Sequence, residues 1–62
     1  MKYLTVALSE DEKTAVITAG DTHIVTLTQE THGLEMMDDI ACAIEATARA
    51  LGAQIFYKDL ED

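Results

Sequence analysis

The sequence predicts a small α+β fold with the element order β-β-β-α-β, in which a four-stranded, mostly antiparallel sheet carries one helix packed on one face. Two hydrophobic periods support this prediction. Apolar and polar residues alternate over residues 1–28, which is typical of strands with one buried face. From Leu34 apolar residues recur every three or four positions, which is typical of an amphipathic helix. A short Ile55-Phe56-Tyr57 run then favours a last strand over residues 54–57.

The alternating part divides into three strands. Leu4, Val6 and Leu8 share one face of the first strand, and residues 9–13 contain no apolar side chain, so they predict an exposed turn. A second strand covers residues 14–19 and a third covers residues 23–28. The Gly20-Asp21 pair between them suits a two-residue hairpin turn, so these two strands are predicted to be antiparallel neighbours.

The helical period ends at Leu51, which gives a helix of roughly five turns. Thr31 or Gly33 is expected to cap its start, and Gly52 suits the left-handed residue that ends a helix. Since short connections join the elements, the last strand is expected to lie parallel beside the first. The predicted core consists of the inward member of each periodic segment: Leu4, Val6, Ile17, Val25, Leu27, Met37, Ile40, Ile44, Leu51 and Ile55.

The chain is read as one domain over residues 1–62. A domain of this size buries only about 60% of the surface that its unfolded chain exposes, so its stability is marginal. Cys42 is the only cysteine, which excludes a disulfide within the chain, and the Cys and His count is too low for a structural zinc site. A homodimer is therefore expected, formed by a sheet edge or by the small-residue side of the helix at Cys42, Ala43, Ala46 and Ala50.

Charge is the most informative functional feature. The chain has twelve acidic and four basic residues, a formal net charge of −8, and the acids are clustered along the sequence. The predicted topology brings ten acids to one end of the molecule, with Lys13 and Lys58 as the only cations expected nearby. We call this set the acidic pole: Glu10, Asp11, Glu12, Glu30, Glu35, Asp38, Asp39, Asp59, Glu61 and Asp62.

Several interpretations of the acidic pole compete. Acids at loops and helix starts can simply keep a small protein soluble and stabilise the helix dipole. Alternatively, concentrated negative charge favours docking on a basic protein, such as one whose groove normally holds nucleic acid. The acids do not match the spaced loop of calcium sites, so no metal is expected. Direct binding to nucleic acid is the least favoured interpretation, because four cations cannot neutralise many phosphates.

The leading hypothesis is a non-enzymatic, protein-binding regulator or inhibitor, with a structural dimerisation domain as the alternative. A hydrolase is a third hypothesis, for which Cys42, His23 and His32 are the only nucleophile and base candidates. Cys42 lies mid-helix, where a small buried thiol is the usual explanation. No cofactor is expected. The lone cysteine fits a reducing compartment, and no long apolar run or leader is found, so a cytoplasmic location without membrane contact is expected.

The element order and the Met1-Lys2-Tyr3 start are similar to those of the small antitoxin domains of the HicB type. The proline-containing turn expected between the middle strands of that family is missing, because the chain has no proline. No site residue is therefore assigned from this resemblance, and a likeness of fold says little about function.

Overall fold

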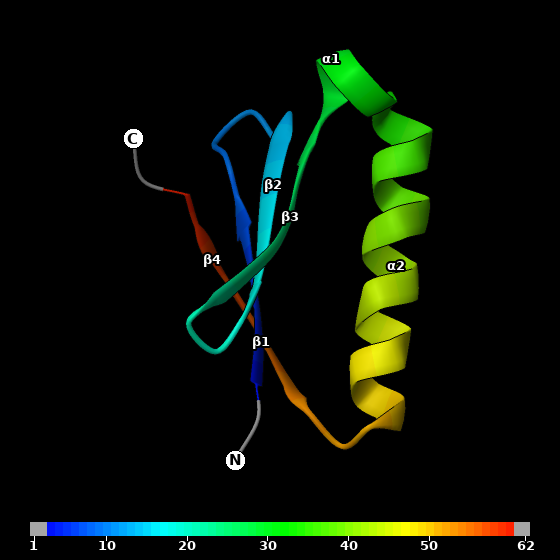
Figure 1. The fold of residues 1–62 in the computed structure, drawn as a ribbon. Helices are drawn as coiled ribbons and strands as arrows, with labels where there is room; N and C mark the ends of the chain where they lie inside the picture. Colours follow the sequence, from blue (N-terminus) through cyan, green and yellow to red (C-terminus); the bar gives the residue numbers. More distant parts are fainter. Residues whose placement is uncertain (1–2, 61–62) are drawn as a thin grey trace.

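The computed structural model describes residues 3–60, and Figure 1 shows how the elements follow one another. Three strands come first: β1 (Tyr3–Leu8), β2 (Thr14–Ala19) and β3 (Thr22–Thr28). A short helix α1 (Gln29–His32), a long helix α2 (Leu34–Ala50) and a last strand β4 (Gln54–Asp59) complete the chain. The predicted β-β-β-α-β order and α+β class are confirmed, and α1 is an addition that the sequence pattern did not indicate.

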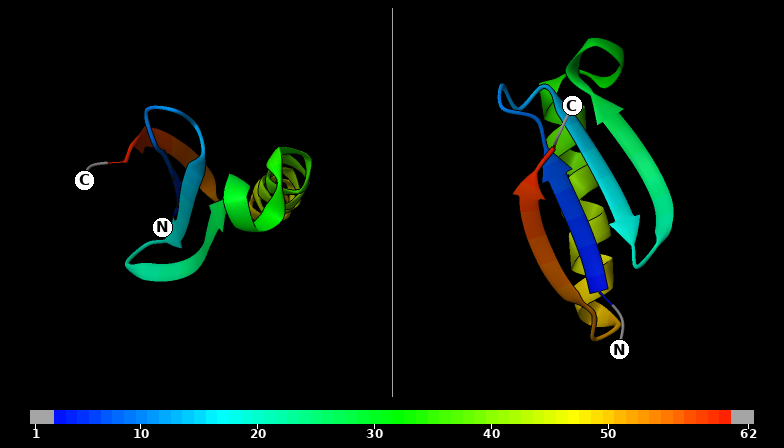
Figure 2. Two further views of the ribbon diagram at one scale, coloured as in Figure 1. Left: turned by 90° about the horizontal axis from the view of Figure 1, so that it is seen from above. Right: turned by 90° about the vertical axis from the view of Figure 1, so that its left-hand side faces the viewer.

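The strands form one four-stranded mixed sheet in the order β3-β2-β1-β4. The β1–β2 and β2–β3 pairs are antiparallel, whereas β4 is parallel to β1, as predicted, with Leu4 level with Ile55. Figure 2 shows α2 running behind one face of the sheet while the opposite face carries no helix. The core therefore lies between α2 and one sheet face.

The β2–β3 hairpin contains the predicted tight turn and an irregularity that was not predicted. Gly20 takes a φ of +59°, which a glycine at the first position of a two-residue hairpin turn adopts without strain. Farther along, Ile17 pairs with Val25 but Thr18 pairs with His23, which leaves Ile24 as an extra residue in β3. Such a bulge bends a strand and increases its twist. In Figure 1 the turn end of this hairpin curves away from α2.

Glycines mark both ends of α2. The N-cap residue is Gly33, with a φ of +81° and no side-chain cap, and Gly52 follows the helix with a φ of +82°. The sequence predicted Thr31 or Gly33 as the N-cap of this helix, and Gly33 is confirmed. Thr31 instead belongs to α1, where its backbone N–H donates to the Thr28 hydroxyl oxygen at 3.2 Å.

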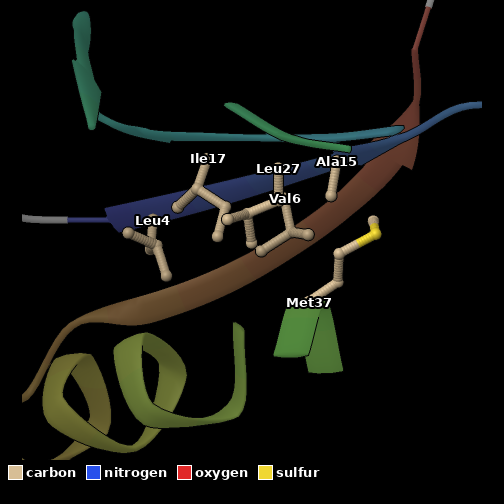
Figure 3. Close-up of a cluster of buried hydrophobic side chains, with 6 residues drawn as sticks. All are labelled: Leu4, Val6, Ala15, Ile17, Leu27 and Met37. Carbon is tan, nitrogen blue, oxygen red and sulfur yellow. The ribbon is translucent and has the colours of Figure 1, made fainter. Parts of the chain in front are cut away.

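The centre of the core joins three strands to one residue of α2. Figure 3 shows Leu4, Val6, Ala15, Ile17 and Leu27 extending from the sheet toward Met37, and all six are buried. Five of the ten predicted core residues belong to this cluster: Leu4, Val6, Ile17, Leu27 and Met37. Four more are only half-buried but pack against it: Val25, Ile40, Ile44 and Ile55.

Leu51 was wrongly predicted to be buried, since 82% of it is exposed. It is the C-cap of α2 rather than a residue of its last turn. Conversely, Ala7 and Ala15 are buried although they are not among the predicted core residues.

The sheet face away from α2 is semi-polar and carries threonines beside aromatic side chains. Register places Thr5 level with Thr18 and with Phe56 on this face. The Phe56 ring meets the ring of Tyr3 edge-on, with centroids 6.0 Å apart. Among the residues that the structure describes, no helix is long and apolar enough to cross a membrane.

Candidate functional site

Eight carboxylates of the acidic pole lie toward one end of the molecule. They come from the β1–β2 turn, from α1, from the first turns of α2 and from the end of β4, which gather at the top of Figure 1. All eight residues are exposed: Glu10, Asp11, Glu12, Glu30, Glu35, Asp38, Asp39 and Asp59. Glu61 and Asp62, also predicted for the pole, lie outside the described residues.

The β1–β2 turn holds its acids in a fixed loop. Asp11 accepts hydrogen bonds from the Ser9 hydroxyl at 2.7 Å and from the Lys13 backbone N–H at 3.0 Å. These two bonds, the Ser9 bond first, lower the pKa of the Asp11 carboxyl below its ordinary value of 3.8. The turn closes with Ser9 N–H donating to Thr14 O at 2.9 Å, and Glu12 takes a φ of +60°. Asp11 is therefore a structural part of the turn, whereas Glu10 and Glu12 flank it.

Two of these acids share a shallow depression with the end of β4. Its lining includes Glu10, Glu12 and Asp59 together with Leu8, Ser9 and Leu60, and its volume is about 550 Å³. The C-terminal segment is attached here by the Leu60 N–H, which donates to Leu8 O at 2.8 Å. Nevertheless, within residues 3–60 no three His, Cys, Asp or Glu side chains lie close enough together to hold a metal ion.

Little positive charge offsets the pole. Against its eight described carboxylates, Lys13 and Lys58 are the cations on the neighbouring segments, which leaves a formal charge of −6. Within the described part of the chain, the one ion pair closer than 4 Å joins Arg49 to Glu45 at 3.7 Å, in the C-terminal half of α2. No carboxylate of the pole therefore forms an ion pair with a residue that the structure describes.

At the opposite end, an apolar groove lies between the C-terminal half of α2 and the ends of β1, β2 and β3. Its volume is about 400 Å³. The bulge residue Ile24 and the helix cap Leu51 both line it. We call this the apolar groove, and its residues are Tyr3, Leu4, Ala19, Ile24, Ala43, Ile44, Thr47, Ala48, Leu51 and Ala53.

The sequence contained only part of the signal for this groove. The apolar helix stripe continues to Leu51, and the small residues of α2 suggest close approach. Ile24, however, alternates with Val25 in the sequence, and this alternation predicts that Ile24 lies on the sheet face away from the core. The bulge overturns that assignment. An extra residue in a strand is not visible in an alternating pattern, because the pattern fixes which residues share a face and not where pairing slips.

The catalytic candidates are not gathered into one site. Cys42 is exposed on α2, which corrects the expectation of a buried thiol. His23 lies on β3, where its Nε2 is 2.8 Å from the Thr26 hydroxyl oxygen. His32 ends α1, and its Nδ1 lies 3.3 Å from both the backbone N and the backbone O of Thr28. Each histidine is thus bonded to its own chain neighbours rather than paired with the thiol.

The comparisons with known proteins give no identity for this chain: no protein-family model matches it, and neither the curated proteins nor the solved structures give a match.

Proposed function

We propose that this protein is a non-enzymatic binding module whose acidic pole docks on a basic surface of another protein. The observation that carries the proposal is the uncompensated charge of the pole, where eight exposed carboxylates stand against two lysines. Concentrated charge of one sign steers association with an oppositely charged surface and raises the on-rate. Such a surface would be a basic protein face rather than a nucleic acid.

The proposal extends to the kind of partner. A protein that binds nucleic acid has a groove lined with Lys and Arg for the phosphates, and a surface rich in carboxylates competes for that groove. The module would then act as a regulator or inhibitor of a nucleic-acid-handling protein, by mimicking the charge of its ligand. We place this role in the cytoplasm, since the exposed lone thiol of Cys42 suits a reducing compartment.

A capture experiment with two matched variants tests this function. Glu10→Gln combined with Asp39→Asn removes two negative charges from the pole without touching the bonded Asp11. Asp21→Lys changes the charge by the same amount at the exposed β2–β3 turn, at the other end of the molecule. Circular dichroism must first show that both variants keep the parent's fold.

The parent and both variants would be immobilised and exposed to lysate at about 0.02 and 0.5 M salt, on either side of the concentration at which the screening length is about 10 Å. We expect the parent and Asp21→Lys to capture the same basic protein at low salt, and the pole variant to capture much less. Equal loss from the two variants would mean that total charge matters and the pole does not.

The second candidate function is a structural domain that forms homodimers. The favouring observation is the number of large apolar side chains left exposed in the single chain. Leu51 is 82% exposed, and six further residues are at least 38% exposed: Tyr3, Ile24, Leu34, Met36, Phe56 and Tyr57. Three of these residues, Tyr3, Ile24 and Leu51, line the apolar groove together, and a contiguous exposed apolar patch marks an interaction site.

A further inference from the structure

We propose that the basic partner adds an extended segment to the free edge of β4, with the cationic end of that segment held at the acidic pole. The inference rests on the proposed function and names the form of the partner: a short extended stretch of chain with Lys or Arg at one end. In this mode of recognition, main-chain hydrogen bonds along a sheet edge supply affinity and flanking side chains supply specificity.

The edge of β4 carries a row of unpaired backbone groups. In Figure 2 β4 forms one edge of the sheet, and within the described part of the chain only β1 pairs with it. The Leu60 N–H donates to Leu8 O, and the backbone groups of successive residues in a parallel strand point to alternate sides. The even-numbered residues of β4 therefore bond to β1. The N–H and C=O groups of Ile55, Tyr57 and Asp59 point to the open side, where a further strand can pair with them.

Of the two sheet edges, β4 is the regular one. Native proteins commonly protect edge strands with bulges, prolines or charges. The other edge strand, β3, is interrupted by the bulge at Ile24, whereas β4 pairs with β1 in continuous register from Gln54 to Asp59. Charge on β4 is confined to its last two residues, Lys58 and Asp59. Most of the β4 edge therefore has none of these protections.

An aromatic side chain flanks this edge on each face of the sheet. Phe56 is 49% exposed on the face away from α2, where its ring meets the ring of Tyr3. Tyr57 is 57% exposed on the α2 face, where its hydroxyl donates to Glu45. Both rings are held by contacts within the chain and still offer apolar surface. A neighbouring strand with β-branched side chains on both of its faces packs against both rings.

Charge complementarity decides which end of the segment is cationic. β4 ends at Asp59, which lines a depression together with Glu10 and Glu12, and all three are exposed. The described lining of this depression contains no cation, and Lys58 is the only cation of β4. In antiparallel pairing, the more stable kind, the N-terminal end of the added segment lies beside Asp59. A second copy of the chain fits this edge poorly, because its own net charge is −8.

The test uses a pair of synthetic peptides of about eight residues, within the usual length of a strand. The first has a pair of lysines at its N-terminal end, followed by alternating valine and threonine. The control peptide keeps the lysines but has proline at every other position, so it lacks the N–H donors that a ladder needs. Amide hydrogen exchange of the ¹⁵N-labelled protein is followed by NMR at about 0.02 M salt, alone and with each peptide.

We expect the first peptide to slow exchange at the Tyr57 amide at least about tenfold, and to change the Phe56 amide, already bonded to β1, much less. A matched pair of variants tests the same hydrogen bond from the protein side. Tyr57→Pro removes the outward N–H at a position where an edge strand tolerates proline, and Tyr57→Ala removes the ring alone. Tyr57→Pro should weaken binding of the first peptide about 3- to 10-fold more than Tyr57→Ala does, which corresponds to one hydrogen bond. Circular dichroism must first show that both variants are folded.

The outcomes separate the edge from the pole. Equal binding of the two peptides, with shifts at the pole and no slowed exchange at Tyr57, would overturn the edge while leaving the pole as a binding site. Unchanged binding of the first peptide to a variant with Glu10→Gln and Glu12→Gln would overturn the role of the pole in holding the cationic end. No binding of either peptide at millimolar concentration would overturn both. Protection of Tyr57 that grows with the concentration of the protein alone would make a second copy the occupant and overturn the basic segment.

Discussion

Burial distinguishes side chains that the sequence pattern treats as equivalent. Ile17 is 0% exposed and lies level with both Val6 and Val25 at the centre of the sheet, whereas Ile40 is half-buried at the edge of the cluster. A truncated side chain costs more where its neighbours surround it completely, because the cavity that remains cannot collapse.

We therefore expect Ile17→Ala to lower the free energy of unfolding by about 2–5 kcal/mol, and Ile40→Ala to fall at or below the bottom of that range. A domain of this size has a total stability of only about 3–9 kcal/mol, so Ile17→Ala will be close to unfolding at room temperature. Urea unfolding followed by circular dichroism measures both values. A larger loss for Ile40→Ala would show that the core is centred nearer to α2.

Ser9 controls the ionisation of Asp11. Its hydroxyl donates to the Asp11 carboxylate and is the largest cause of the lowered Asp11 pKa. Because the folded pKa lies below the unfolded value, this interaction stabilises the fold above the ordinary value of 3.8 and is lost as the pH falls through the folded pKa. We expect Ser9→Ala to move the Asp11 pKa upward toward that ordinary value. Carboxyl chemical shifts followed by NMR during an acid titration measure it, and an unchanged Asp11 pKa would contradict the assigned cause.

At the scale of elements, one contact ties the edge strand β4 to α2. The Tyr57 hydroxyl donates a hydrogen bond to Glu45 Oε1, and the same carboxylate pairs with Arg49. The Glu45 carboxylate is the largest cause of a raised Tyr57 pKa. Glu45 is thus a structural residue that joins β4 to α2.

Since the folded pKa of Tyr57 is raised above its ordinary 10.0, its bond to Glu45 is fully present below pH 10 and is lost as the pH rises through the folded pKa. Tyr57→Phe should lower the free energy of unfolding by about 0.2–1 kcal/mol at neutral pH, the range of exposed pairs. The variant should also lose less of its free energy of unfolding above pH 10 than the parent does. Urea unfolding at pH 7 and in the alkaline range measures both effects. Equal alkaline loss in the parent and the variant would mean that the bond contributes nothing in solution.

The sequence predicts the strands and the long helix better than it predicts the connections and the irregularities between them. Alternation located β1 and β2, and the period of three to four residues located α2, because each pattern repeats several times within its element. Helix α1 has only four residues and no apolar stripe, so nothing periodic indicates it. Leu51 is exposed as the C-cap, one residue beyond the end of α2, and the helical period does not show where the helix stops. The pole could be predicted because chain direction and short loops decide which end each turn occupies.

At the scale of the whole molecule, the acidic pole and the apolar groove lie at opposite ends. The acids at the pole repel one another, and no ion pair with a described residue offsets them. We expect stability to rise when sodium chloride is raised from about 0.02 to 0.2 M, because the screening length falls below about 10 Å. Urea, which is uncharged, keeps the ionic strength under control in this measurement. A urea midpoint that is constant or falls with salt would show that the acids lie too far apart to repel.

Binding through the acidic pole is tested most directly by an NMR titration of the ¹⁵N-labelled protein with a short lysine-rich peptide at low ionic strength. Amide shifts report on each residue separately, so they locate the contact rather than only its strength. We expect the largest shifts at residues 10–13, 30–39 and 59, and none of comparable size at Asp21, which is an exposed acid at the other end of the molecule. Shifts as large at Asp21 as at the pole would contradict a localised site and leave the acids with the role of keeping a small protein in solution.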